Sequence, residues 1–287
     1  MNRLIYSRKQ RIFNDRRKVL YLSKRVLIIG DTHLGSDTAV CPEEIELESG
    51  NVISANEIQL AILHEFRTMI DEVGKVDLLI LNGDLVDGTN YYGEGAGILT
   101  CSMDKQAEIA VDLLSEIKFR KVVGCTGTPY HTKKNPNLDK RVIEDLGGVC
   151  MPEVSLNIYD TRIYANHRTP VRMSQWESRA QSVAKDILLN ELNQMDFGHY
   201  DIICKSHAHY YIGYDHGSSV GFVLPCWKGR DEFAKGSVNP FAFNPSIGYV
   251  MFDIETDGSF SWSRSVKHLK GNNAIKSYDI EDIPSRY

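Results

Sequence analysis

Carboxylate and imidazole side chains stand at two points of the chain where an apolar run ends. The run RVLIIG, residues 25–30, leads into Asp31 and His33, and the run VDLLILNG, residues 76–83, leads into Asp84. Both runs are typical of strands buried on both faces. Because ligands of open α/β sheets bind at the carboxyl ends of strands, neighbouring strands would bring these three side chains together.

A further pair of histidines lies in the stretch KSHAHYY, directly after the apolar run YDIIC. In extended backbone, side chains two residues apart point to the same face. We therefore expect Asp31 and His33 to share a face, and likewise His207 and His209. The histidine pair can then chelate an ion, whereas one core and one surface histidine would require opposite faces.

Carboxylates and imidazoles together suit divalent ions, with Mn²⁺ as the first candidate and Fe, Zn²⁺ or Ni²⁺ as alternatives. One carboxylate between two ions can bridge them, and Asp84 is the candidate because it stands alone after its strand. Thiolates are not required. The six cysteines are scattered without a CxxC pair, which predicts free thiols.

Helices are predicted between the strands that carry these residues. Residues 54–74 have apolar side chains at helical spacing, with Ser54 and Glu57 as a capping box and Gly74 at the end. A helix, a strand and a short helix should follow at residues 103–117, 121–125 and 139–146. This alternation is typical of a parallel sheet with crossover helices.

The second half of the chain is rich in strands. The expected elements are a hairpin around Asp160 and Thr161, a helix capped by Ser174 with Glu177 and reaching about Met195, strands from Tyr200 onward, and a hairpin turning at Asp257 and Gly258. We therefore predict an α/β protein: a layered β-sandwich flanked by helices, with a dinuclear metal site at the C-terminal ends of strands.

Four stretches resemble the pattern of the calcineurin-like metallophosphoesterases, which runs GD-x-H, GD-x-x-D, GNH, a lone histidine and GH-x-H. They are GDTHLG, GDLVDG, the isolated NH of YANHRTP, and SHAH, and they match in order and spacing over residues 25–209. The resemblance implies a β-sandwich with helices packed outside it. It also implies that Asp31, His33 and His209 hold one metal, His167 and His207 the other, and Asp84 both.

The chain departs from this pattern at two motifs. Ser206 replaces the glycine of the last motif, and GCTGTPYH stands in place of Gly-Asn-His. Alignment on Gly127 puts Thr128 where the family has its asparagine ligand, with His131 two residues later than expected. His131 is then either the general acid or the missing ligand, and the variant resembles one in phage-encoded members.

Other side chains near these motifs are candidates for supporting roles. Asp87 is expected to orient a ligand or the loop. Cations that could bind a phosphate group or the substrate backbone are Arg168, Lys205, Lys228 and Arg230.

Charge and length bound the organisation of the chain. Its 287 residues, 42% hydrophobic and 25% charged, are ordinary for a globular protein. No apolar stretch approaches a membrane span, so we expect a cytoplasmic protein that does not associate with membranes. The expected division is a basic arm at 1–24, a metallophosphoesterase domain at 25–270 and a tail at 271–287.

The basic arm bears on the substrate. Residues 1–25 hold nine of the 33 Lys and Arg residues and one acid, Asp15. Such a segment could hold a polyanion, including nucleic acid, near the site, or it could be a solvated edge strand or tail.

The remaining alternatives concern the reaction. Protein phosphatases of the family carry Arg directly after the second motif, where this chain has Gly88. The motif GDTHLG is more similar in sequence to the corresponding motif of the repair nuclease subunits. These features favour a phosphoesterase that cleaves phosphodiester bonds, with DNA as a candidate substrate. A phosphomonoesterase and a metal-binding scaffold that has lost catalysis remain as alternatives.

Overall fold

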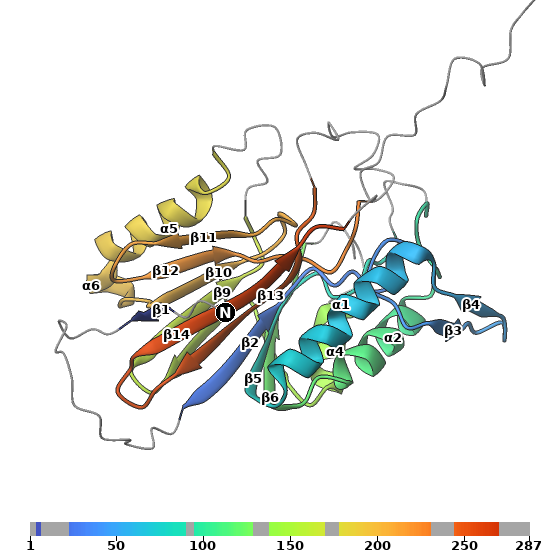
Figure 1. Ribbon diagram of the computed structural model, residues 1–287, viewed down its shortest axis with the longest axis horizontal. Coiled ribbons are helices and arrows are strands. Elements are labelled where there is room, and N and C mark those ends of the chain that lie inside the picture. The colour runs from blue at the N-terminus through green and yellow to red at the C-terminus, as the bar shows by residue number, and fades with distance from the viewer. Residues whose placement is uncertain are drawn as a thin grey trace, which may run out of the picture.

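Two β-sheets packed against each other form the centre of the protein (Figure 1). The structure, a computed structural model, describes residues 4–6, 23–89, 95–128, 138–169, 178–230 and 244–269. Within these residues, helices cover the outer face of each sheet. The predicted layered α/β sandwich is therefore confirmed.

Among the described residues, the first sheet has seven strands in the order β1-β14-β13-β2-β5-β6-β7. Four of them are parallel: β2 Lys24–Ile29, β5 Val76–Asn82, β6 Phe119–Cys125 and β7 Val149–Met151. Three antiparallel strands complete it: β13 Ile247–Ile254, β14 Phe260–Lys267 and the edge strand β1 Leu4–Tyr6. Part of the expected basic arm thus belongs to this sheet.

Three helices cover the outer face of this sheet: α1 Glu57–Val73, α2 Met103–Ser115 and α4 Leu138–Asp145. Phe66 of α1 is fully buried and meets the ring of Trp227 edge-on at 5.0 Å between centroids. Gly74 ends α1 with a φ of 62°, a left-handed conformation that glycine adopts without a steric cost.

In the described part of the chain, the second sheet has five strands in the order β11-β12-β10-β9-β8. Their bounds are β8 Val154–Ile158, β9 Thr161–Asn166, β10 Ile202–Lys205, β11 Ile212–Asp215 and β12 Val220–Val223. Helix α5, Gln181–Leu192, packs on its outer face and is followed by α6, Gln194–Phe197. Gly221 allows this contact, because a Cβ there would lie 2.4 Å from a methyl group of Val183.

The inner faces of the two sheets share one apolar core. Ile28 and Ile80 of the first sheet and Cys204 and Phe222 of the second are buried in it. Because the core fixes the sheets face to face, the ends of β2, β5, β9 and β10 lie close together. The loops that follow these strands carry the predicted ligands.

Several local predictions need correction. Helix α1 begins after Asn56, whose side chain accepts hydrogen bonds from the backbone N–H groups of Ile58 and Gln59, so the capping box is Asn56 with Gln59. Ser54 instead ends a small strand, β4 Val52–Ser54, paired with β3 Glu44–Glu46. The sequence patterns did not indicate this hairpin.

Two further predictions shift in the second half. The β8–β9 turn lies at residues 159–160, one residue earlier than expected. Helix α5 begins at Gln181 after Ala180, which makes no side-chain cap bond. The predicted cap of Ser174 and Glu177 lies outside the described residues.

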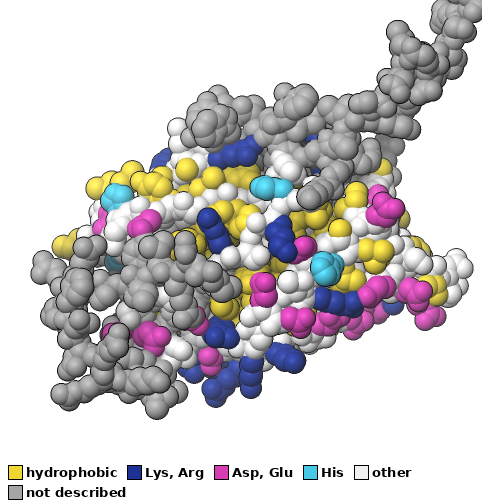
Figure 2. Space-filling view, in the orientation of Figure 1, with side chains coloured by type: hydrophobic (Ala, Val, Ile, Leu, Met, Phe, Trp, Pro, Cys, Tyr) yellow, Lys and Arg dark blue, Asp and Glu magenta, His cyan; other side chains and the backbone are white. Residues whose placement is uncertain are grey.

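The described surface carries both signs of charge. Figure 2 shows basic and acidic side chains beside one another along the lower edge of this face. No described helix is long and apolar enough to cross a membrane.

Candidate metal centre

The loops after β2 and β5 run side by side and bring the first two motifs together. The backbone N–H of Asp31 donates to the carbonyl of Gly83 at 3.0 Å, and that of His33 donates to the carbonyl of Asp84 at 3.0 Å. These bonds continue the pairing of the two parallel strands beyond their ends. Asp31 and Asp84 are thereby placed next to each other, as the sequence predicted.

The backbone at the predicted ligands is left-handed rather than extended. The φ angles are 51° at Asp31, 45° at His33, 49° at Asp84, 75° at His207 and 56° at His209. Non-glycine residues adopt this region rarely and at a cost of about 1–3 kcal/mol each. The expectation of extended backbone with shared faces is therefore wrong, since these residues follow the strands and turn individually.

The first ligand group consists of Asp31, His33 and His209. The Nε2 atoms of the two histidines are 3.0 Å apart, and Asp31 Oδ1 lies 3.4 Å from His209 Nε2 and 3.8 Å from His33 Nε2. All three ligand atoms lie within 4.8 Å of one another. Three atoms with lone pairs at this spacing could hold one metal ion.

The second group consists of Asp84, His167 and His207. Asp84 Oδ2 lies 2.9 Å from His167 Nε2 and 3.9 Å from His207 Nδ1. The two groups adjoin, because Asp31 Oδ1 is only 3.8 Å from His167 Nε2. His207 and His209 therefore belong to different groups of a single site.

The site opens to solvent on the side of this histidine pair. Side-chain exposure is 33% for His207 and 19% for His209, but no more than 2% for Asp31 and Asp84. The two carboxylates thus form the floor of the site and the histidine pair its mouth.

A buried ion pair supports the first group. Asp87 Oδ1 lies 3.0 Å from His33 Nδ1 and accepts a hydrogen bond from Lys228 Nζ at 2.8 Å. The contact directs Nε2 of His33 toward the site, and it is the kind of contact through which Asp87 would orient a ligand. Lys228 is 4% exposed and paired with Asp87, so the expectation that it contacts substrate is not supported.

The electrostatics of the first group follow from burial and these contacts. Burial and the charge of Lys228 oppose protonation of His33, but its interactions with the carboxylates of Asp31 and Asp87 outweigh them and raise its pKa to about 9. Burial lowers the pKa of His209. Burial would raise the pKa of Asp31, yet the charges of His167 and His209 hold it well below its usual range.

Neutral groups support the second ligand set. Nδ1 of His167 donates to the backbone carbonyl of Asn82 at 2.7 Å, which leaves the Nε2 lone pair facing the carboxylate of Asp84. This Nε2 is buried and makes no hydrogen bond. The lone pairs of His167 Nε2 and of the Asp84 carboxylate therefore face each other, which is favourable only with a cation between them. Imidazole nitrogens and a carboxylate are suitable ligands for a divalent metal ion.

The same arrangement without a metal favours a proton. Burial opposes the charge on His167, but Asp84 and Asp31 outweigh it and raise its pKa to about 10. A metal ion and a proton would therefore compete for this nitrogen.

The altered third motif lies against Asp84. The backbone N–H of Thr128 donates to Asp84 Oδ1 at 2.7 Å, and its hydroxyl donates to Oδ2 at 3.1 Å. Gly127 permits this approach, because a Cβ there would lie 1.9 Å from Asp84 Oδ1. Thr128 thus contacts a ligand carboxylate at the position where the family pattern has asparagine.

Asp139, at the start of α4, was not singled out from the sequence. Its carboxylate accepts hydrogen bonds from the backbone N–H groups of Asp84 at 3.1 Å, Leu85 at 2.8 Å and Gly127 at 2.7 Å. Burial, followed by the charge of Asp84, raises its pKa. Asp139 joins two motif loops through their backbones, and no residue pattern could have indicated this.

The remaining candidates take different positions. Arg168 is exposed directly after His167, which keeps it available to a substrate. Lys205 pairs with Asp186 on α5, and Arg230 is buried at 3% exposure. His131 lies outside the described residues.

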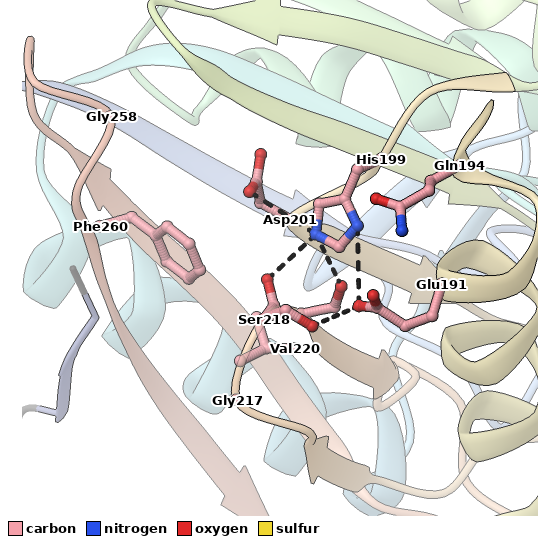
Figure 3. A pocket seen from close by; sticks show the side chains of 10 residues that line it. Glu191, Gln194, His199, Asp201, Gly217, Ser218, Val220, Gly258 and Phe260 are labelled. Carbon is pink, nitrogen blue, oxygen red and sulfur yellow. Dashed lines mark hydrogen bonds and ion pairs between the residues drawn. The ribbon is translucent and has the colours of Figure 1, made fainter. Parts of the chain in front are cut away.

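A separate hollow of about 280 Å³ lies at the other end of the second sheet (Figure 3). It is lined by Asp201, which precedes β10, and by Val220 at the start of β12. His199 projects into it, and Nε2 of this ring lies 3.2 Å from the carbonyl of Ser218. The ligand groups follow the opposite end of β10, so this hollow is not the metal centre.

Fold and ligand geometry together define a metallophosphoesterase-like protein. Residues 24–127 match the family model of the calcineurin-like phosphoesterases. The match ends at the altered third motif, just before the part of the loop that carries His131. No curated protein sequence matches the chain.

Solved structures similar to this chain share little of its sequence. One is vacuolar protein sorting 29 from Cryptosporidium parvum, with 14% identity over 86% of this chain and 99% of that one and a TM-score of 0.44. A novel archaeal phosphodiesterase has 12% identity over 85% and 99%, with a TM-score of 0.40. Zinc-complexed vacuolar protein sorting 29 from Entamoeba histolytica has 16% identity over 84% and 98%, with a TM-score of 0.37.

Proposed function

We propose that the chain is a dinuclear metal-dependent hydrolase that cleaves phosphodiester bonds, with nucleic acid as the candidate substrate. The observation that carries this proposal is the pair of adjoining ligand groups, in which Asp31 Oδ1 reaches His209 at 3.4 Å and His167 at 3.8 Å. Two cation sites this close are typical of enzymes that act on phosphate esters.

The ligand assignment follows the two groups. Asp31, His33 and His209 would hold one ion and Asp84, His167 and His207 the other, with Asp84 as the proposed bridge to the first ion and Mn²⁺ as the first candidate metal. When bound, two divalent ions would supply Lewis-acid activation of water and would neutralise phosphate charge.

The protein's own groups orient this chemistry. Thr128 fixes both oxygens of Asp84, and Asp87 fixes the ring of His33. Arg168, exposed and next to His167 in the chain, would pair with a phosphate oxygen. His131 remains our candidate for the acid that protonates the leaving oxygen.

Preference for a diester over a monoester is supported by the second motif. Gly88 has a φ of 73°, and the side chain of Gln106 bonds both its N–H and its carbonyl at 2.8 Å. No cationic side chain is present at this position, and Lys228 is engaged with Asp87. A phosphodiester carries one charge fewer than a monoester dianion and needs fewer such partners.

The polyanion-binding role of the basic segment and a cytoplasmic location also belong to this proposal. The first rests on the nine Lys and Arg residues among residues 1–25. The second is favoured by six free cysteines, since disulfides are rare in reducing compartments.

A non-catalytic metal-binding scaffold is the second candidate. It is favoured by Thr128, which hydrogen-bonds Asp84 where the family pattern supplies an amide ligand. Such a scaffold would bind metal and hydrolyse no phosphate ester.

Turnover with Mn²⁺ separates these functions. We expect hydrolysis of bis(p-nitrophenyl) phosphate and nicking of plasmid DNA. Asp84→Asn should lower both activities by more than about 100-fold, which exceeds the usual effect of removing a residue that only supports a metal ligand. Preference for p-nitrophenyl phosphate would establish a monoesterase instead. Bound metal with no turnover on either substrate would establish the scaffold.

A further inference from the structure

The side chain of Asn82 lies at the point where both sheets meet the ligand loops. Asn82 is the last residue of β5 and is completely buried. It stands two residues before Asp84, and its backbone carbonyl accepts the hydrogen bond of His167 Nδ1. Its amide therefore lies directly behind the second ligand group.

All polar atoms of this amide are engaged across the site. Nδ2 donates to Ser206 Oγ at 2.7 Å and to the carbonyl of Asn166 at 3.2 Å, and Oδ1 lies 3.1 Å from Cys125 Sγ. Asn166 directly precedes His167, and Ser206 directly precedes His207. The amide thus connects the ends of β5 and β6 to the ends of β9 and β10.

We propose that Asn82 is a positioning residue that sets the distance between the two sheets at the second ligand group. The inference rests on the proposed function, since it assigns Asn82 to the ion held by Asp84, His167 and His207. Through Asn166 and Ser206, the amide fixes the residues that precede both histidines. A buried amide bonded to both loops leaves neither histidine free to move away from Asp84.

Ser206 is the partner that makes this arrangement specific to the chain. Its hydroxyl replaces the glycine of the family pattern and supplies the acceptor for Asn82 Nδ2. It also packs closely on Gly30, where an added Cβ would lie 2.6 Å from Ser206 Oγ. Asn82 and Ser206 should therefore act as a pair.

A double-mutant cycle with metal titration tests the pair. Asn82→Leu and Ser206→Ala should each weaken binding of one of two Mn²⁺ ions by about 10–100-fold, the usual effect of removing a partner behind a metal ligand. The other ion should bind as before. The double variant should lose less than the product of the two single effects, because the shared bond is lost only once.

Reference variants identify the affected ion. With Co²⁺ as a spectroscopic probe, the absorption spectrum of Asn82→Leu should resemble that of His167→Ala rather than that of His33→Ala. Resemblance to His33→Ala, equal loss of both ions, or wild-type affinity for both would overturn the inference. A wild-type protein that binds no metal would instead refute the proposed function.

Asn190 provides a matched control. Its Nδ2 donates to Ser219 Oγ at 3.1 Å and to the carbonyl of Tyr200 at 2.9 Å, so it repeats the bonding of Asn82 at the other end of the second sheet. Asn190→Leu should lower thermal stability without changing either metal affinity. If it weakens the same ion as Asn82→Leu, general destabilisation explains the effect and the positioning role is refuted.

Discussion

The two ligand groups are equally buried at their carboxylates but are supported in different ways. Behind His33 stands a charged pair, Asp87 and Lys228, whose side chains are no more than 5% exposed. Behind His167 stand a backbone carbonyl and the amide of Asn82. The first group is therefore governed by charge balance and the second by the fit between two sheets.

This difference separates what each group should respond to. Removal of one partner of a buried ion pair leaves an uncompensated buried charge. The resulting loss of folding free energy is larger than the stabilisation that the intact pair provides. Loss of a neutral hydrogen bond mainly exposes a polar atom to an apolar surrounding. Charge substitutions at Asp87 and Lys228 should therefore perturb the first group selectively, whereas pH should affect both groups.

The largest expected effect is the pH dependence of metal binding. The pKa is raised to about 9 for His33 and about 10 for His167, so a metal ion must displace a proton at lower pH. Mn²⁺ affinity at the first group should fall by about 100-fold between pH 9 and pH 7, since each pKa unit corresponds to a factor of ten. Calorimetric titration at several pH values measures this.

The metal-free protein should show the opposite trend. A raised folded-state pKa stabilises the fold below the unfolded value of about 6.5, and this contribution is lost as pH rises through about 9 to 10. Thermal unfolding in the presence of a chelator should therefore show that stability falls between about pH 6.5 and pH 10. Metal affinity independent of pH would contradict the arrangement of both histidines.

The second largest effect is expected for the substitution Lys228→Met. It leaves Asp87 buried beside His33 and should destabilise the metal-free protein by about 3 kcal/mol, the lower end of the cost of breaking a buried pair. The pKa of His33 should also rise, because Lys228 opposes its protonation. Urea unfolding measures the first effect and the pH profile of Mn²⁺ binding the second.

Lys24→Met is the control for charge removal. Its ion pair with Asp77 is about one-third exposed on both sides, so the loss should stay below about 1 kcal/mol. Equal destabilisation by Lys24→Met and Lys228→Met would remove the distinction between charged and neutral support.

The smallest effect is expected at Thr128. Thr128→Val removes the hydroxyl bond to Asp84 but retains the backbone N–H bond, so turnover should fall by about 3–10-fold, equivalent to about 1 kcal/mol. Thr128→Ser should restore it, and both variants should retain two metal ions. Loss of an ion from Thr128→Val, measured by metal content, would show that Thr128 is a ligand.

The sequence predicted the ligand set better than the local geometry around it. Asp31, Asp84 and their partners were identified because strand ends and motif spacing are visible in the chain. Extended backbone at His207 and His209 was the wrong reason for grouping them, since a left-handed φ at a non-glycine residue leaves no compositional mark. Asn56 displaced Ser54 as the helix cap because strand pairing had already engaged Ser54.

The supporting residues show where sequence reasoning stops. Asn82 contacts Cys125 and Ser206, which lie 43 and 124 residues further along the chain. Asp139 bonds the backbone of Asp84, 55 residues away, and that of the nearer Gly127. Such contacts depend on how two sheets pack, and neither residue belongs to a motif. Lys228 looked available because its burial depends on the same packing.

The division of the ligands between loops of both sheets gives the bound ions a mechanical role. Asp31 and Asp84 follow strands of one sheet, while His167, His207 and His209 follow strands of the other. Metal ions bound by these ligands would crosslink the two sheets at one end only. Metal-loaded protein should therefore resist separation of its halves there, and the end that carries the hollow beside His199 would open first.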